Sequence, residues 1–348
     1  MLGTGIAGEL DYKDGWRKAD HTKHGVFAMD YLGLDIAKAK FDAHLLTATR
    51  KHSISLPNTE TGFAQLAAWL ARHRASAEAG LHACMEATGN WGLDLAAFLH
   101  AAGITVSIVN PKQIKLFGDC ELSRNKTDKL DAGVIARFCC SQRPMAWAPP
   151  AAEIRELREL VRRCAALKAN RTQELNRQKA GMVSPTVAAS IERMLDHIEQ
   201  EISQINTAIR DLIARHAALA LNFTLLRSIP GIGEVTAVLV LAEIPNIAEF
   251  TPKGLGAFTG LSPQEDTSGK RRGKAGISRI GNATLRSAFY LCALTARRHN
   301  PNLAAFVKRM VEAKKPNKVI LTAIARKLLV MAHAVIRTQT PFQAATAA

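Results

Sequence analysis

The chain has 348 residues, of which 47% are hydrophobic and 22% charged, as is typical of a globular protein with room for two or three domains. No stretch approaches the roughly eighteen uncharged apolar residues of a membrane helix, and residues 1–28 mix charge with glycine, so neither a membrane span nor a secretory leader is expected. The six cysteines lack C-x-x-C spacing, which argues against a zinc site or a disulfide framework and predicts reduced thiols in a cytoplasmic protein.

The formal charge of +16 is concentrated at one end of the chain. Residues 268–348 contain 16 Lys and Arg residues and 1 acidic residue, whereas the rest of the chain is nearly balanced. A folded segment this basic repels itself unless a polyanion is near, and nucleic acid bound through its phosphates is the expected partner. A membrane surface is the weaker alternative, because the segment has helices with their own core positions rather than one amphipathic anchor.

The N-terminal third predicts a mixed sheet flanked by helices. Three strands without intervening helices come first, so a doubly wound sheet is not expected. Asn58 or Thr59 is expected to cap the first helix, and Gly103 to end the second. The predicted strands cover 27–36, 41–47, 51–56, 80–87 and 104–109, and the predicted helices cover a segment after residue 59, 91–102, 111–118 and 127–142.

Prolines 144, 149 and 150 mark a linker that leads to two predicted helices. The first covers 152–180. The second carries apolar residues at alternating spacings of four and three, a heptad seam typical of a coiled coil. The seam can pair with the first helix in a hairpin or with another copy of the chain. Its residues are Ile191, Leu195, Ile198, Ile202, Ile205, Ile209 and Leu212.

Residues 226–244 resemble a helix-hairpin-helix, because Pro230-Gly231-Ile232-Gly233 forms a tight turn before a helix. In such a unit, the amides of Gly231 and Gly233 and the helix N-terminus can meet a DNA phosphate without reading bases. The alternative is an ordinary packing element. A glycine-rich stretch, 253–281, follows, and the last predicted helices cover 283–299, 301–313 and 317–337.

Four carboxylates stand out as candidate metal ligands. Asp35 and Glu86 end two predicted strands, and Asp128 and Asp131 lie on one face of a predicted helix. Their oxygens suit Mg²⁺ or Mn²⁺, and such ions can clamp a phosphodiester. Taken singly, each acid could be a solvated charge, and Asp128 could cap its helix. Asp42 lies nearby, and its position on the next strand does not exclude it.

Ser268 is a candidate nucleophile in a glycine-flanked loop. Lys270, Arg271, Arg272 and Lys274 follow it, and Arg279 lies beyond. Such cations can stabilise charge that develops on an attacked phosphate. By itself the pattern is also that of an ordinary turn.

Aromatic residues make up only 5% of the chain, which favours contacts to phosphates over stacking on bases. Tyr290, in the apolar run SAFYLCAL, is expected to be a core residue.

Several motifs in this order and spacing resemble those of a known family. They are GLDIAK (33–38), EATG (86–89), RNKTDKLDA (124–132), RPMAW (143–147), QELNR (173–177), SIPGIG (228–233), FTGLSP (258–263) and KVIL with RKL (318–328). The chain is identified on these motifs as a member of the DEDD transposases of the insertion-sequence 110 family, the bridge-RNA-guided recombinases. The resemblance covers about Tyr31 to Pro341, and residues 1–28 have no counterpart in it.

The resemblance implies an α/β RNase H-like (RuvC-like) domain over 29–148, coiled-coil helices over 149–218, and a mainly helical transposase domain with the helix-hairpin-helix and the serine over 219–348, after an extension at 1–28. It places the four catalytic acids on Asp35, Glu86, Asp128 and Asp131, and the nucleophile on Ser268.

The implied activity is DNA recombination through a phosphoserine intermediate with Mg²⁺ held by the acids, Mn²⁺ being possible. The implied partners are donor and target double-stranded DNA and a structured noncoding bridge RNA. The protein is expected to be a homodimer that assembles to a homotetramer, with acids and serine from different protomers. It is expected in the bacterial cytoplasm and at the nucleoid when acting.

Two other functions share these residues. A metal-dependent, structure-selective nuclease of the Holliday-junction type would use the four acids without a serine nucleophile. A non-catalytic nucleic-acid-binding protein would need neither, but the four intact acids argue against it.

Overall fold

The computed structural model describes residues 29–344, apart from 77, 79, 88, 90, 121–127, 182–183, 265–266, 269–270, 273–275 and 279. The predicted N-terminal extension lies outside the described residues. The chain divides into two compact units between Pro149 and Pro150, and each unit is described by itself.

The N-terminal unit contains a five-stranded sheet with the strand order β3-β2-β1-β4-β5. The pairs β1–β2 and β2–β3 are antiparallel, and the pairs β1–β4 and β4–β5 are parallel. The predicted mixed sheet is thereby confirmed. Its strands are β1 (Asp30–Ile36), β2 (Lys40–Leu46), β3 (Lys51–Pro57), β4 (Leu81–Glu86) and β5 (Thr105–Val109).

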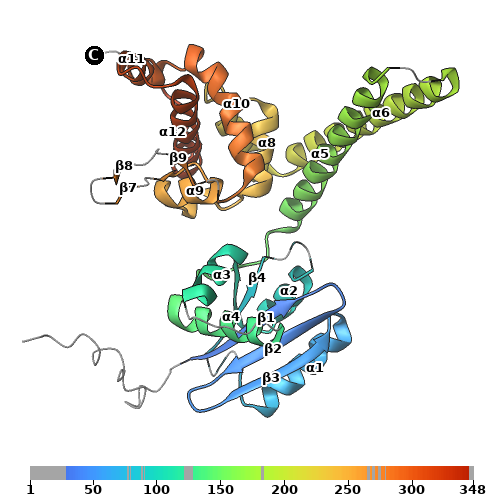
Figure 1. Cartoon of the computed structure of the whole chain (residues 1–348), viewed down its shortest axis with the longest axis vertical. Coiled ribbons are helices and arrows are strands. Elements are labelled where there is room, and N and C mark those ends of the chain that lie inside the picture. The colour runs from blue at the N-terminus through green and yellow to red at the C-terminus, as the bar shows by residue number, and fades with distance from the viewer. Residues whose placement is uncertain are drawn as a thin grey trace, which may run out of the picture. The chain divides into compact units, whose positions relative to one another are not determined.

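Helices cover both faces of this sheet (Figure 1). Even-numbered residues of β1, such as Leu32 and Leu34, pack with the first two helices, and odd-numbered ones, such as Tyr31, pack with the other two. A strand covered on both faces is apolar along most of its length, as β1 is. The helices are α1 (Glu60–Arg72), α2 (Leu93–Ala101), α3 (Pro111–Cys120) and α4 (Asp128–Gln142).

A short extended segment after α4 continues the sheet beyond β5. The amide of Trp147 donates to the carbonyl of Val106 at 2.6 Å. Buried Ser107 Oγ lies 2.8 Å from the carbonyl oxygen of Met145 and 2.8 Å from Nε2 of His82. Burial lowers the pKa of His82 below its usual range. The RPMAW motif thus binds the chain that follows α4 to strand β5 at the edge of the sheet.

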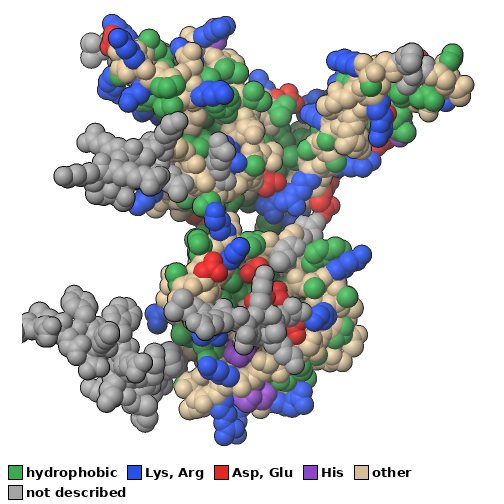
Figure 2. Space-filling model, in the orientation of Figure 1, with side chains coloured by type: hydrophobic (Ala, Val, Ile, Leu, Met, Phe, Trp, Pro, Cys, Tyr) green, Lys and Arg blue, Asp and Glu red, His purple; other side chains and the backbone are tan. Residues whose placement is uncertain are grey.

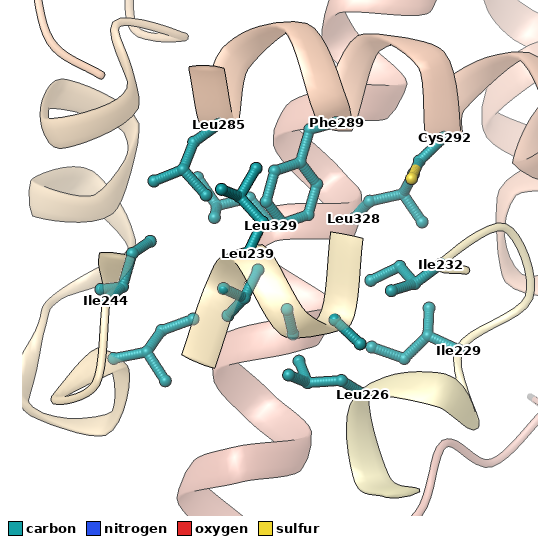
Figure 3. Close-up of a cluster of buried hydrophobic side chains, with 14 of the residues drawn as sticks. Leu226, Ile229, Ile232, Leu239, Ile244, Leu285, Phe289, Cys292, Leu328 and Leu329 are labelled. Atoms are coloured by element: carbon teal, nitrogen blue, oxygen red, sulfur yellow. The ribbon is translucent and has the colours of Figure 1, made fainter. Parts of the chain in front are cut away.

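The C-terminal unit is mainly helical and is built around one large apolar core (Figure 3). Leu226, Ile229, Leu239, Phe289 and Leu328 come from four separate segments and are at most 6% exposed. The helices are α5 (Ala152–Lys179), α6 (Pro185–Arg215), α7 (Ala217–Arg227), α8 (Glu234–Glu243), α9 (Pro252–Thr259), α10 (Ala283–His299), α11 (Ala304–Glu312) and α12 (Asn317–Thr338), with short 3₁₀ turns at Ile247–Glu249 and Pro301–Leu303.

The long helices α5 and α6 form an antiparallel hairpin. Cys164 Sγ lies 3.5 Å from Oδ1 of Asn206, and Arg171 Nε lies 2.7 Å from Oε2 of Glu199. The later residue of α5 thus contacts the earlier residue of α6, as in an antiparallel pair. The predicted heptad seam of α6 faces α5, where Ile198 and Ile202 pack with Leu167. Of the two predicted partners for this seam, the structure therefore shows pairing with the preceding helix of the same chain.

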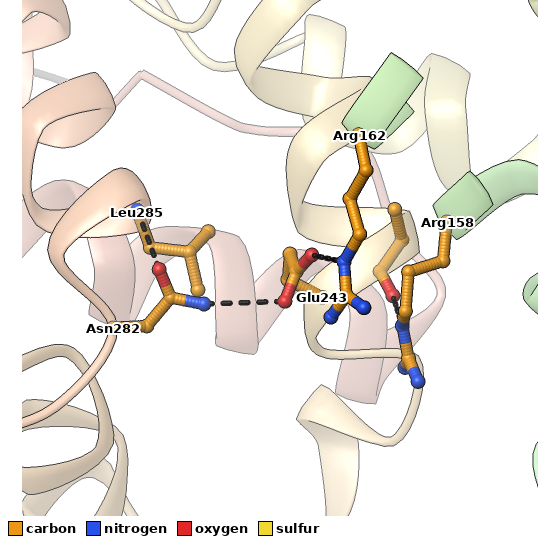
Figure 4. A network of polar contacts seen from close by, with 6 residues as sticks. Arg158, Arg162, Glu243, Asn282 and Leu285 are labelled. Carbon is orange, nitrogen blue, oxygen red and sulfur yellow. Dashed lines mark hydrogen bonds and ion pairs between the residues drawn. The ribbon is translucent and has the colours of Figure 1, made fainter. Parts of the chain in front are cut away.

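A polar network joins the hairpin to the helical core (Figure 4). Arg162 Nε lies 3.5 Å from Oε1 of Glu243 at the end of α8, and Asn282 Nδ2 donates to Oε2 of Glu243 at 3.2 Å. Asn282 also caps α10, because its Oδ1 accepts from the amide of Leu285 at 3.0 Å. Arg158 Nε donates to the carbonyl of Ala242 at 3.0 Å. The carboxylate of Glu243 thus contacts both the hairpin, through Arg162, and the start of α10, through Asn282.

Helix α12 passes a length and hydropathy test for a membrane span, with a mean hydropathy of 1.9 over the tested window. However, 56% of that window is buried, and Ile324, Leu328 and Leu329 are fully enclosed in the core. Its apolar character is explained by its central position in the helical unit.

Two helices and four short strands were not predicted from the sequence. Helix α7 precedes the predicted hairpin turn, and α9 lies inside the glycine-rich stretch. The short strands are β6 (Pro263–Gln264), β7 (Thr267–Ser268), β8 (Arg271–Arg272) and β9 (Gly276–Ile277), which pair as β6–β9 and β7–β8.

Candidate functional site

Two of the predicted acids lie side by side at the carboxyl ends of parallel strands. Leu34 of β1 pairs with Met85 of β4, so the next positions in register are Asp35 and Glu86. Both side chains extend from the sheet face that α4 covers, because Asp35 follows the odd-numbered residues of β1. Both residues are partly buried. The sheet itself therefore brings together two residues that are far apart in the sequence.

Helix α4 carries the other two acids and lies unusually close to β1. A Cβ atom on Gly33 would stand 2.0 Å from the carbonyl oxygen of Ala132 and 2.4 Å from the amide nitrogen of Ala136. Only glycine permits this approach of the two backbones. The close packing sets the first turn of α4, with Asp128 and Asp131, over the end of β1. Gly33 belongs to the GLDIAK motif, but the sequence alone does not indicate this role.

The electrostatics of Glu86 show that three acids share one neighbourhood. Burial, and then the nearby carboxylates of Asp35 and Asp131, raise the pKa of Glu86 above its usual range. The side chain of Asp128 lies outside the described residues, although its backbone begins α4. The structure thus brings together Asp35, Glu86 and Asp131 of the four predicted ligands.

The donor chemistry of this cluster fits a hard divalent cation. Carboxylate oxygens are the ligands that Mg²⁺ and Mn²⁺ prefer, and a cation would relieve the repulsion that Glu86 experiences. Within the part of the chain that the structure describes, no three acidic, histidine or cysteine side chains already stand close enough to enclose an ion. The ligand set of four acids stays a prediction.

Asp42 is a fifth acid beside the cluster. It lies directly opposite Asp35 in the antiparallel pair of β1 and β2, so both side chains extend from the same face of the sheet. Asp42 is 5% exposed, and Lys40 Nζ lies 3.4 Å from its Oδ2. The sequence could not assign Asp42, because only the strand register places it beside Asp35.

The candidate nucleophile lies in a short hairpin of the C-terminal unit. Ser268 ends β7 and pairs with Arg271 of β8, and Thr267 pairs with Arg272. This pairing keeps two of the predicted cations next to the serine in the backbone trace. Lys270, Lys274 and Arg279 lie outside the described residues, as do the side chains of Ser268, Arg271 and Arg272.

The predicted phosphate-binding turn lies between α7 and α8. Gly231 has φ +106°, and a Cβ there would stand 2.6 Å from the Cβ of Ala296, so glycine is required by packing. Gly233 precedes the first residue of α8, and a Cβ there would meet open space. Glu234, in the first turn, lies 3.8 Å from Arg210. Gly233 is exposed and Gly231 is half-buried, and the role of both in phosphate binding stays a prediction.

Basic side chains are prominent on the C-terminal unit. Lys and Arg side chains are spread over the visible face of its helices, whereas acidic and basic side chains both lie on the visible face of the N-terminal unit (Figure 2). This distribution agrees with the strongly basic composition of residues 268–348.

Comparisons with known proteins cover nearly the whole chain. A family model for DEDD transposases of the IS110 type, described as "Transposase", matches residues 32–184, and the model "Transposase IS116/IS110/IS902 family" matches residues 223–308. The "Pilin gene-inverting protein" of Moraxella lacunata is 33% identical over 90% of this chain and 97% of its own length. The "Transposase for insertion sequence element IS1111A" of Coxiella burnetii is 26% identical over 65% of this chain and 69% of its own length.

Among solved structures, "T. thermophilus RuvC in complex with Holliday junction substrate" is similar at 14% identity and a TM-score of 0.26, over 34% of this chain and 98% of its own. A TM-score of 0.26 supports no conclusion about this chain. Two family models match this chain, and a relative is 33% identical to it along nearly the full length of both. The chain therefore belongs to the IS110 family of transposases and site-specific recombinases.

Proposed function

We propose that this protein is an RNA-guided DNA recombinase in which Ser268 attacks a DNA phosphodiester. The observation that carries the proposal is the convergence of Asp35, Glu86 and Asp131 at the end of a mixed sheet, where burial and then the two neighbouring carboxylates raise the pKa of Glu86. A strand order of three antiparallel strands followed by two parallel ones supports the RNase H-like (RuvC-like) assignment of this unit.

The acids would hold Mg²⁺, or Mn²⁺, through Asp35, Glu86, Asp128 and Asp131. When bound, such a cation supplies positive charge at the scissile phosphate and favours ionisation of a nearby hydroxyl. The chain's own contribution is to fix the carboxylates on two strands and one helix, so that little reorganisation is needed.

In the proposed step, Oγ of Ser268 forms a bond to phosphorus and the bond from phosphorus to the 3′ oxygen breaks. The serine loses one proton and the leaving 3′ oxygen gains one, which leaves a phosphoserine link and a free 3′-hydroxyl. Attack of that hydroxyl on the corresponding link of the other DNA reverses the chemistry and completes strand exchange. Arg271 and Arg272 are proposed to stabilise charge on the attacked phosphate.

The acids and the serine belong to separate compact units of the chain. We place the acids of one protomer against the serine of another, in a homodimer that assembles to a homotetramer. A bridge RNA would pair donor and target DNA, and Gly233 with the basic C-terminal residues would hold phosphates. Action at the nucleoid follows from such DNA binding.

A covalent-trapping assay tests the nucleophile. Protein, its RNA and Mg²⁺ are mixed with end-labelled target DNA, and the denatured products are examined for a protein–DNA adduct. The adduct should form with wild type and with the control Ser203→Ala, in the exposed surface of α6, and should disappear with Ser268→Ala. Free cleaved DNA without adduct, unchanged by Ser268→Ala, would instead identify a metal-dependent junction nuclease.

Mixing two inactive variants tests the assembly. Asp131→Asn should abolish the adduct, whereas Asp196→Asn on α6 should not. If acids and serine come from different protomers, a mixture of Ser268→Ala and Asp131→Asn proteins should recover part of the adduct. No recovery, with both variants folded and able to mix, would argue for a site within one protomer.

A further inference from the structure

The C-terminal unit contains a cavity that the proposed chemistry does not use. It has a volume of about 1010 Å³ and lies between α10, α11, α12 and the strands β6 and β9. Its wall includes the aromatic rings of Tyr290 and Phe306 together with Val330 and Met331. Tyr290, which was expected in the core, packs against it but is only partly buried and also lines the cavity. The size lies at the upper end of the range of ligand-binding cavities.

The polar side chains of this cavity carry positive charge. Arg286, Lys318, Arg326 and Lys327 line it, and the described lining includes no acidic residue. Lys327 Nζ lies 4.6 Å above the ring centroid of Phe306, and an Arg286 guanidinium nitrogen donates to the carbonyl of Thr259 at 3.1 Å. Apolar, flat surfaces beside several cations suit an occupant that is anionic and aromatic at once.

The cavity lies next to the segment that carries Ser268. Pro263 of β6 pairs with Ile277 of β9, and both residues line the cavity. The chain leaves the cavity at β6, passes through Ser268, and returns to it at β9. Both ends of the segment that carries Ser268 are therefore at the cavity wall.

We propose that this cavity binds unpaired DNA flanking the phosphodiester that Ser268 attacks. Bases would pack against Tyr290 and Phe306, and phosphates would contact Lys318, Arg326 and Lys327. This assignment rests on the proposed function, because strand exchange requires each strand to leave its own duplex. Cations combined with aromatic rings are the general means of binding single strands without reading their sequence. An acidic peptide would match the charge but leaves the aromatic wall unexplained.

The test measures equilibrium binding, so that it does not depend on catalysis. The full chain carrying Ser268→Ala is titrated, without divalent metal, against a labelled single-stranded DNA of about 12 nucleotides, within the site sizes of single-strand binders. The same measurement is made with a duplex, with RNA of the same sequence and with an oligoglutamate peptide.

The variants are matched by exposure. Val319, which lines the cavity, is 46% exposed, and Val311, which does not, is 48% exposed. Val319→Glu should weaken single-strand binding by about tenfold or more, whereas Val311→Glu should change it by less than about twofold. Tyr290→Leu should weaken it by about tenfold and Tyr290→Phe by little, since the phenyl ring still stacks. Lys327→Ala should also make the slope of log K against log salt concentration less negative by about 0.7, the contribution of one phosphate contact to a single strand.

Several outcomes would overturn the assignment. Equal losses for single strand and duplex would indicate a general phosphate surface, and tighter binding of RNA or of the peptide would assign the cavity to that partner. Wild-type binding by both Val319→Glu and Tyr290→Leu would exclude the cavity altogether. A failure of the serine mechanism would appear separately, as the absence of a wild-type adduct in the trapping assay.

Discussion

Replacing Gly33 by alanine tests the packing that places the acids. The added methyl group would stand 2.0 Å from the carbonyl oxygen of Ala132 and 2.4 Å from the amide nitrogen of Ala136. Carbon atoms in contact lie about 3.5 Å or more from their neighbours, so β1 and α4 must separate by about 1.5 Å. Neither neighbour is a side chain that can rotate away, because both atoms belong to the helix backbone.

This separation should lower both stability and activity. Overpacking of this kind costs about 2–3 kcal/mol of the free energy of unfolding. Moving Asp131 by about 1 Å relative to Asp35 and Glu86 should reduce the rate of adduct formation about 100-fold. Urea unfolding measures the first effect, and the trapping assay in the folded range measures the second.

Gly133→Ala is the matched control on the same helix. A Cβ at Gly133 would meet its closest atom, a guanidinium nitrogen of Arg137, at an ordinary 3.5 Å. Alanine favours a helix over glycine by about 0.5–1 kcal/mol, so this variant should be as stable as wild type or more stable. If Gly33→Ala matches Gly133→Ala in stability and rate, the close approach of α4 to β1 does not set the site.

Three further changes give contrasting results. Glu86→Gln should abolish the adduct yet raise the free energy of unfolding by about 1 kcal/mol at neutral pH without divalent metal. The pKa of Glu86 is raised in the folded state, so the wild-type protein should gain stability as the pH falls through that pKa. The variant should lack this gain when urea unfolding is repeated across the pH range. Asn282→Ala should cost about 1–2 kcal/mol in urea unfolding, since it removes a helix cap and a contact to Glu243, and an unchanged midpoint would refute this. Arg171→Ala should cost at most about 0.5 kcal/mol, because its partner Glu199 is 62% exposed, and a larger loss in the same assay would contradict this.

The elements that could be predicted are those whose signals are local. Strand β1 and helix α1 carry their periodicity and caps within a few residues, and Thr59 caps α1 by accepting from the amide of Gly62. Asn58, the rival cap, instead donates to the carbonyls of Ala37 and Trp91. The four acids could be proposed as ligands because they stand at the ends of such elements, and the structure brings Asp35, Glu86 and Asp131 together.

Long-range register and close packing could not be read from the sequence. Asp42 acquires its place only from the pairing of β1 with β2, and Gly33 only from the approach of α4. Helix α9 was missed because Gly254 and Gly256 lower its helix propensity. Its start was nevertheless signalled by Thr251, whose Oγ1 accepts from the amide of Gly254, and by Pro252 in the first turn.

The heptad seam of α6 shows how a clear local pattern leaves the partner open. Its period predicts a partner helix, but the same period serves a hairpin and a dimer equally well. In the structure the seam packs against α5, where Leu167 and Cys164 form an apolar cluster with Ile198 and Ile202. A second copy could use the seam only by displacing α5 and exposing these residues to water. The proposed dimer is therefore expected to form through surfaces other than this seam, and the hairpin to act as a spacer fixed to the core through Glu243.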